Sequence, residues 1–203
     1  MDVTTIALAS GLAWASGLRL YMVLFLVGTA GYFGWLVLPS HLQVLAHPLV
    51  LGTSGTLAVA EFVADKVPGF DSLWDAVHTF IRIPAGALLA AGAIGGLGAD
   101  NLPLMVAAGL IGGTITAGSH FTKAASRVAI NHSPEPFSNW LASFFEDLTA
   151  PGIVWLAIAA PWLLLAALLC AILAMLWILP RLWRWISAIL KRISHWAAAG
   201  TPG

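Results

Sequence analysis

The sequence predicts an all-α integral membrane protein, and three observations support this class. Of the 203 residues, 60% are hydrophobic and 9% are charged, whereas about a quarter of the residues in soluble domains are charged. The apolar runs reach the roughly 20 residues that a membrane helix needs and are far longer than barrel strands. Only helices and closed barrels satisfy the backbone in lipid. We therefore expect five to six membrane or re-entrant helices in one polytopic domain, residues 1–180.

The first apolar stretch, residues 3–38, is interrupted by a single charged residue, Arg19. As one helix it would be about 54 Å long, against a hydrocarbon core of about 30 Å. We therefore expect a break at Ser16-Gly17, which would give two short helices or a re-entrant hairpin. One long tilted helix is the alternative.

The segments that follow are bounded by proline, glycine or polar turn residues, which end helices. The expected membrane helices are 49–66, 84–98, 104–128 and 151–179, the last with a kink at Pro161, and the two expected short amphipathic helices are 70–81 and 137–148. Pro84 suits the first turn of its helix, where a missing N–H is tolerated.

The C-terminal segment, residues 181–203, is basic and differs from the rest of the chain. Arg184, Lys191 and Arg192 share one helical face, and large apolar side chains occupy another. This pattern predicts an interfacial helix over 181–196, parallel to the membrane. The positive-inside rule places it in the cytoplasm, in a multi-pass protein of a bacterial inner membrane. A plain stop-transfer anchor is the alternative reading of these charges.

The middle of the chain carries a weak internal repeat. Residues 72–76 (Ser-Leu-Trp-Asp-Ala) match residues 138–142 (Ser-Asn-Trp-Leu-Ala), and the same offset matches Gly86 with Gly152. The pattern predicts duplicated halves, 49–98 and 104–179, an arrangement that many transporters share. If each half crosses twice and the tail is cytoplasmic, both short amphipathic helices lie on the outer side.

Ionisable residues inside a membrane are costly and indicate function by default. Glu61 and Asp65 lie four residues apart on one helical face and form an acidic stripe, whereas His120, Lys123 and Arg127 form a basic stripe. Folding these two stripes together, with Arg19 in the same region, would compensate the charges. The predicted ligand-binding residues are Arg19, Glu61, Asp65, Lys66, Asp71, Asp75, His78, Arg82, Lys123 and Arg127.

Other kinds of site are less well supported by the sequence. The carboxylates and His78 would suit Mn or Mg, but Lys66 and Arg82 lie among them and no dedicated metal motif occurs. Catalysis needs a nucleophile beside a base, and Ser72 and Ser138 are too generic to indicate one; no phosphate-binding loop is present. We therefore expect no enzyme activity, no metal and no cofactor. The expected partners are membrane lipids, a small anionic or lipid ligand and a second copy of the chain, but no nucleic acid.

Three segments together resemble a known family. They are Gly11-Leu-Ala-Trp-Ala-Ser-Gly-Leu-Arg-Leu-Tyr21, Glu61-Phe-Val-Ala-Asp-Lys-Val-Pro-Gly-Phe-Asp71 and Leu73-Trp-Asp-Ala-Val-His78. The chain up to about residue 180 is similar to a bacterial membrane family catalogued as domain-of-unknown-function family 4126. Where such proteins carry Arg-Pro, this chain has Arg82-Ile83-Pro84. The resemblance implies an inner-membrane location and a common role for the charged residues, and it supplies no substrate.

Two functions remain open from the sequence. The first is a small transporter or lipid-handling protein with a charged site for an anionic or amphipathic ligand, which arginines would hold by bidentate hydrogen bonds. The second is a membrane scaffold whose charges form structural ion pairs. A wet cavity that reaches one side would favour the transporter, whereas direct and dry ion pairs would favour the scaffold.

Overall fold

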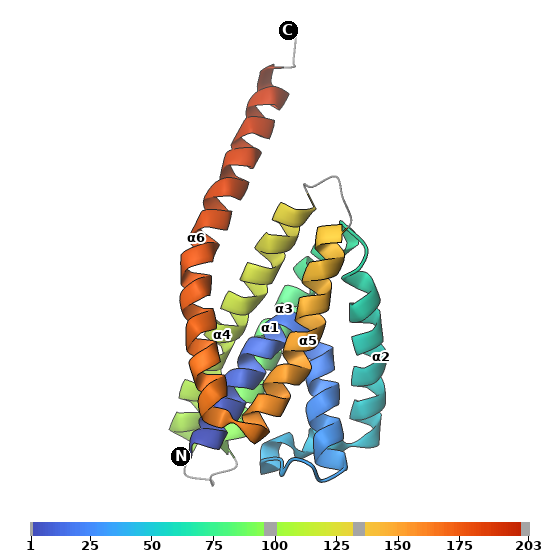
Figure 1. Ribbon diagram of the computed structural model, residues 1–203, viewed down its shortest axis with the longest axis vertical. Coiled ribbons are helices and arrows are strands. Elements are labelled where there is room, and N and C mark those ends of the chain that lie inside the picture. The colour runs from blue at the N-terminus through green and yellow to red at the C-terminus, as the bar shows by residue number, and fades with distance from the viewer. Residues whose placement is uncertain (1, 96–100, 132–136, 200–203) are drawn as a thin grey trace.

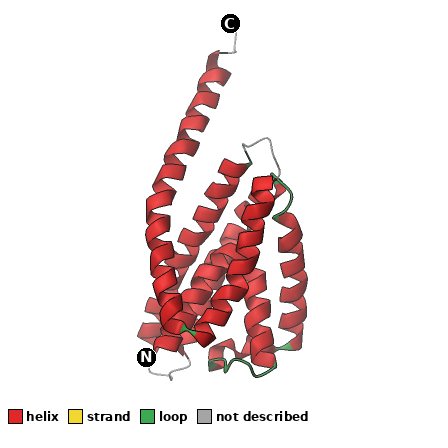
Figure 2. Cartoon of the chain, in the orientation of Figure 1, coloured by secondary structure: helices red, strands yellow, loops and turns green. Residues whose placement is uncertain are grey.

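The computed structural model describes residues 2–95, 101–131 and 137–199, and within these ranges the chain is helical without strands (Figure 2). The elements are α1 (Val3–Tyr32), the 3₁₀ helix η1 (Ser40–Ala46), α2 (Pro48–Ala64), α3 (Phe70–Gly95), α4 (Leu102–Ile130), α5 (Phe137–Ala159) and α6 (Pro161–Ala199). This confirms the predicted all-α class. The glycine-rich end predicted at 96–98 and most of the loop after Asn131 lie outside the described residues.

The helices have the length and composition of membrane spans. Five of the described helices are long and apolar enough to cross a membrane, or six if η1 and α2, which meet at 68°, count as one broken span. Large apolar side chains such as Trp155, Trp162 and Leu163 are exposed on the outer surface. Such a surface is unfavourable in water and suits lipid. The chain is therefore a multi-pass membrane protein, in agreement with the predicted number of spans.

Helix α1 is broken at Arg19 and folds back as a re-entrant hairpin. The backbone of Arg19 is non-helical, with φ −143° and ψ 70°. Figure 1 shows the first half of α1 rising from the N-terminus and the second half returning to the same end of the bundle. Contacts agree, because Ile6 lines a groove with Ile94, and η1, which follows α1, also packs near the end of α3, with Leu42 beside Gly92. The predicted break is confirmed, two residues beyond Gly17.

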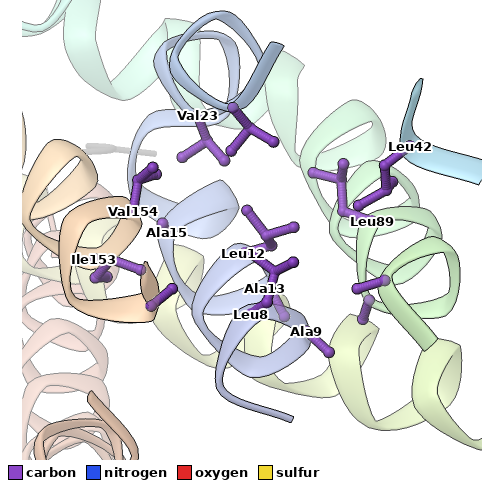
Figure 3. Close-up of a cluster of buried hydrophobic side chains, with 14 of the residues drawn as sticks. Leu8, Ala9, Leu12, Ala13, Ala15, Val23, Leu42, Leu89, Ile153 and Val154 are labelled. Carbon is purple, nitrogen blue, oxygen red and sulfur yellow. The ribbon is translucent and has the colours of Figure 1, made fainter. Parts of the chain in front are cut away.

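The hairpin occupies the centre of the bundle and supplies much of its core. Leu12 and Ala13 are almost completely buried. Figure 3 shows Leu12 between Ile153 of α5 on one side and Leu89 of α3 on the other. All of the other helices are thus arranged around an element whose turn carries an arginine.

The expected helix over 151–179 is wrong, because the chain reverses direction at Ala160. Helix α5 descends and α6 ascends, in an open V (Figure 1). A Cβ atom at Gly11 would meet both Ile153 of α5 and Leu164 of α6, whereas one at Gly118 of α4 would meet Met175, farther along α6. Proline is tolerated at the first position of a new helix, so Pro161 begins α6 instead of kinking a single span.

This reversal also corrects the predicted topology. The starts of α3 and α5, which contain the two amphipathic segments, lie at the same end of the bundle as the C-terminal half of α6 (Figure 1). The predicted topology, with both segments on the outer side and the tail in the cytoplasm, is therefore wrong. Both segments are also continuous with the helix that follows, because α3 passes through Pro84 and α5 passes through Pro151. Membrane helices tolerate internal proline when neighbouring groups satisfy the freed carbonyl.

The tail does not form a separate helix. Helix α6 continues through Pro180 to Ala199, and Figure 1 shows it projecting beyond the other helices. Residues 181–196 are helical, as predicted. However, the chain does not turn at residue 180, as a helix lying parallel to the membrane would require. Because proline at this point removes one backbone hydrogen bond without ending the helix, the sequence signal for a boundary was misleading.

The predicted duplication stays a prediction. Helices α2 and α4 both run toward the tail end of the bundle, and α3 and α5 both return (Figure 1). This order agrees with two related halves. The charged residues, however, do not fall on matching positions, since Asp75 aligns with Leu141.

A close crossing of α1 and α4 yields a stability prediction. A Cβ atom at Gly17 would overlap the Ser119 hydroxyl and lie within 2.9 Å of the His120 backbone nitrogen, whereas one at Gly52 would meet nothing within 4 Å. We expect Gly17→Ala to destabilise the protein by about 1–3 kcal/mol through overpacking and Gly52→Ala to have no such cost. Thermal unfolding in detergent measures both, and equal melting temperatures would contradict the crossing.

The helix directions predict which loops face the cytoplasm. Arg181 and Arg184 place the tail inside by the positive-inside rule, and the turn at 65–69 lies at the same end of the bundle. In a Cys170→Ala background, we expect Ser40→Cys to react with a membrane-impermeant maleimide from outside and Val67→Cys to be protected. Labelling of Val67→Cys in intact spheroplasts would overturn this orientation.

Candidate functional site

The charged residues meet in one cluster, called here the buried charge network. Its ion-paired members are six carboxylates and five cations: Glu61, Asp65, Asp71, Asp75, Glu146 and Asp147, with Arg19, Lys66, Arg82, Lys123 and Arg127. Nine of the ten predicted ligand-binding residues belong to it, and only His78 does not. Most of these side chains are fully buried, which is costly unless each charge is compensated.

Arg19 joins three helices at the turn of the α1 hairpin. Its Nη1 lies 2.7 Å from Asp65 Oδ2 of α2, and its Nη2 lies 2.6 Å from Asp147 Oδ1 of α5. The same Nη2 donates to Ser143 Oγ at 2.9 Å. A guanidinium presents donors in a rigid fork, and here the fork spans two carboxylates on different helices. The backbone break at Arg19 is what directs this side chain into the network.

Asp65 also forms an ion pair with Lys123, and this contact confirms that the acidic stripe faces the basic stripe. Lys123 Nζ lies 2.6 Å from Asp65 Oδ2 and donates to the Leu18 carbonyl at 3.0 Å. Leu18 immediately precedes the break in α1, where a carbonyl is free of its helical partner. The lysine thus holds α2 and α4 against the turn of the hairpin.

Glu61 does not meet the basic stripe as expected. Its Oε1 accepts from Arg82 Nη2 at 2.6 Å, and Arg82 Nη1 donates to Asp75 Oδ1 at 2.7 Å. Asp75 and Arg82 lie seven residues apart on α3, two helical turns along one face. Within residues 49–98, Arg82 therefore neutralises part of the negative charge of the acidic side chains.

Helix α5 supplies four polar residues that the sequence analysis left out of the site. They are Asn139, Ser143, Glu146 and Asp147. The first three are spaced by four and three, so they share one helical face. That spacing was visible in the sequence. The prediction of a separate short amphipathic helix over 137–148 kept these residues out of the predicted site.

Arg127 of α4 contacts network residues of α5 and α3. Its Nη2 lies 2.8 Å from Glu146 Oε2, and its Nη1 donates to both oxygens of Asn139. Asp71 lies 4.0 Å from the same Nη1 and accepts hydrogen bonds from the Gly69 and Ser72 backbone N–H groups and the Asn131 amide. Asp71 is therefore solvated mainly by neutral donors.

The two buried histidines differ in role. Arg82 Nη1 lies 3.3 Å from His120 Nδ1, and because a guanidinium only donates, Nδ1 is the acceptor. His120 is thus neutral, and its Nε2–H faces Thr79 Oγ1 at 2.7 Å. His78 stacks on Trp74 with ring centroids 4.0 Å apart and makes no ion pair with a described residue. The structure places it beside the network, not in it.

The network reaches the surface at one corner. The side chains of Lys66, Asp147 and Glu146 are 33%, 14% and 13% exposed, whereas the other members are at most 1% exposed. Lys66 Nζ pairs with Asp147 Oδ2 at 3.0 Å and donates to Ser143 Oγ. Among the described residues, no group of three or more His, Cys, Asp or Glu side chains is arranged to hold a metal ion. The carboxylates face cations instead.

Two lipid-facing grooves meet this exposed corner. One, of about 560 Å³, runs between the second half of α1 and α2, past Phe25 and Ala58, and ends at Asp147. The other, of about 600 Å³, is lined by aromatic residues of α5 and ends at Lys66. Each groove thus brings apolar side chains next to one member of the Lys66–Asp147 pair.

Comparison with known proteins identifies the family and no activity. No curated protein and no solved structure matches the chain. The family described as Domain of unknown function (DUF4126) matches residues 6–181, which contain the α1 hairpin and every member of the buried charge network. The chain therefore belongs to the DUF4126 family.

Proposed function

We propose that the protein is a small transporter or lipid-handling protein for an anionic amphiphile, such as a phospholipid. The ligand's acyl chain would lie in the groove between α1 and α2, and its head group would bind at Lys66 and Arg19. The observation that carries this proposal is the groove that ends at Asp147, the residue that Arg19 and Lys66 share.

The chemistry at the end of the groove suits an anionic head group. Arg19 and Lys66 share the carboxylate of Asp147, which a phosphate could replace with similar charge-assisted hydrogen bonds. The Nε–H group of Arg19 has no acceptor among the described residues. This unused donor would give a head group that displaces Asp147 an additional hydrogen bond.

The broken α1 helix supports movement of a ligand as well as its binding. Transporters commonly place binding sites at discontinuous helices near the centre of the membrane. Here the discontinuity coincides with Arg19, so a shift of the hairpin tip would move the head-group site itself. Few residues would need new backbone angles, because Arg19 is already non-helical.

A ligand-retention experiment tests the proposal. Ala58→Phe would fill the groove that ends at Asp147, whereas Ala91→Phe would fill a groove of about 500 Å³ between α3 and α4 that reaches no charged residue. We expect mass spectrometry of the purified protein to detect an anionic lipid, which Ala58→Phe and Lys66→Gln lose and Ala91→Phe retains. Equal retention by all variants, or no bound amphiphile, would contradict the proposed site.

The scaffold function is the second candidate, and a specific observation favours it. The ion pairs are direct, and the described grooves are lined almost wholly by apolar side chains. A polar cavity reaching one side is the feature that would distinguish a transporter. For a transporter, the observed arrangement is therefore a closed state, and a second, open state must exist. A scaffold needs no open state, so a conformational change on adding phospholipid would distinguish the transporter from the scaffold.

The proposal extends to location and assembly. The family resemblance and the basic tail support a bacterial inner membrane with a cytoplasmic C-terminus. A second copy of the chain is a further expected partner, and the lipid experiment does not depend on it. Catalysis is not part of the proposal.

A further inference from the structure

The buried charge network contains an uncompensated negative charge. Six carboxylates face five cations, so the fully ionised network carries a charge of −1. His120 does not offset this, because its Nδ1 accepts a hydrogen bond from Arg82 and the ring is neutral. An unpaired charge in a low-dielectric interior is strongly unfavourable, and a buried group commonly becomes neutral instead. One proton would balance the network.

The carboxylates differ in how well they are compensated. Asp65 lies 2.7 Å and 2.6 Å from the nitrogens of Arg19 and Lys123. Asp75 and Asp147 also have two cationic partners each, and Glu146 has three. Asp71 has one distant cation but accepts three N–H donors. Only Glu61 combines a single cationic partner with no further donor to its carboxylate among the described residues.

The one partner of Glu61 is itself shared. Arg82 donates to Glu61 through Nη2 and to Asp75 through Nη1, at 2.6 Å and 2.7 Å. Glu61 Oε2 and Asp75 Oδ2 are both buried without a hydrogen-bond partner among the described residues, but Asp75 also has Lys123 at 3.4 Å. Two carboxylates on one guanidinium resemble a dyad that holds one proton between two acids. The proton would occupy Oε2 and leave the bond from Arg82 to Oε1 unchanged.

The surroundings of Glu61 on every packed helix agree with this assignment. The charged groups close enough to act on it are Arg82 on α3, Lys123 on α4, Arg19 on α1 and Asp65 on its own helix. Of these, Arg19 and Lys123 make their close ion pairs with Asp65, and Arg19 reaches only the Glu61 backbone carbonyl. The Tyr21 phenol also lies near Glu61, and His120 contacts Arg82 from the far side.

We infer that the buried charge network binds one proton at neutral pH and that Glu61 carries it. The inference does not depend on the proposed function. If the network opens for a ligand, Arg82 could exchange its carboxylate partners. Such an exchange would release or take up this proton.

Infrared spectroscopy of the purified protein at neutral pH tests the inference. A protonated carboxyl has a C=O stretch that carboxylates lack, and the band shifts in D₂O. The detergent must contain no ester or carboxyl group. We expect the band in the unmodified protein, its loss in Glu61→Gln and its retention in the matched control Asp71→Asn. A glutamine side chain is isosteric with the protonated acid, so the Glu61→Gln variant is expected to elute as a folded protein.

Isotope labelling gives a second measurement that needs no variant. In unmodified protein grown with ¹³C-labelled glutamate, the band must shift if the proton is on a glutamate and stay unchanged if it is on an aspartate. Absence of the band would overturn the inference, because His78 or a bound cation would then balance the charge. Loss of the band in Asp75→Asn but not in Glu61→Gln would overturn the assignment to Glu61.

Discussion

Replacing Asp65 by asparagine is expected to destabilise the folded protein by about 3–5 kcal/mol, the range for breaking a buried ion pair from one side. Asp65 is fully buried and holds both Arg19 and Lys123 within 2.7 Å. An amide cannot compensate either cation, and its NH₂ group adds donors where acceptors are needed. Unfolding in mixed detergent micelles, followed by tryptophan fluorescence, measures this difference in the free energy of unfolding.

A double-mutant cycle tests whether the effect arises from the contact with Lys123. Lys123→Met removes the second charge, so the double variant should lose about 0.5–3 kcal/mol less than the sum of the single variants. Asp147→Asn is the comparison and is expected to cost less free energy of unfolding than Asp65→Asn. Its partner Lys66 is 33% exposed, so water can replace part of the pair. Additive effects of Asp65→Asn and Lys123→Met would show that the two stripes do not interact energetically.

The second large effect is expected at the turn of the α1 hairpin. Arg19→Gln should cost about 3–5 kcal/mol, because it leaves Asp65 and Asp147 without their common cation. Arg19→Lys should recover only part of this loss. The guanidinium places separate nitrogens, Nη1 and Nη2, against Asp65 and Asp147, and the single nitrogen of an ammonium cannot occupy both positions.

Arg184→Gln is the matched control for this prediction. Arg184 is exposed on α6, and its one hydrogen bond among the described residues is to the Pro180 carbonyl of its own helix, so its replacement should change stability by about 0.5 kcal/mol or less. The same unfolding measurement applies to all three variants. Full stability of Arg19→Lys would show that charge alone matters at the turn and that the fork geometry does not.

Spacing in the sequence was sufficient to predict most of the network. Residues four apart on α2 and three and four apart on α4 indicated two faces of opposite sign, and Asp65 with Lys123 confirms that they meet. The excessive length of the first apolar stretch predicted a break at Ser16-Gly17, and the structure has it at Arg19. The contact between the stripes could be predicted because uncompensated charges in lipid leave few possible arrangements.

Other features depended on tertiary contacts that no local pattern specifies. Cations that could pair with Glu61 occur on both α3 and α4. Only the packing of α3 against α2 selects Arg82 of α3 as the partner. Proline at 161 reverses the chain, whereas proline at 84 and 151 does not. The outcome at each proline depends on what surrounds the freed carbonyl, which the sequence alone does not show. Because Pro161 alone of these three prolines coincides with a reversal of the chain, the direction of α6 and the position of the tail could not be predicted.

The re-entrant hairpin also determines the order in which the protein can be assembled. An arginine near the centre of an isolated membrane helix costs about 2.5–3.5 kcal/mol on insertion. The partners of Arg19 are Asp65 on α2 and Asp147 on α5, so the second is translated only after four further helical elements. Until α5 is inserted, Arg19 can pair with Asp65 but not with Asp147. The final arrangement of the hairpin therefore depends on a helix that is translated much later than the hairpin itself.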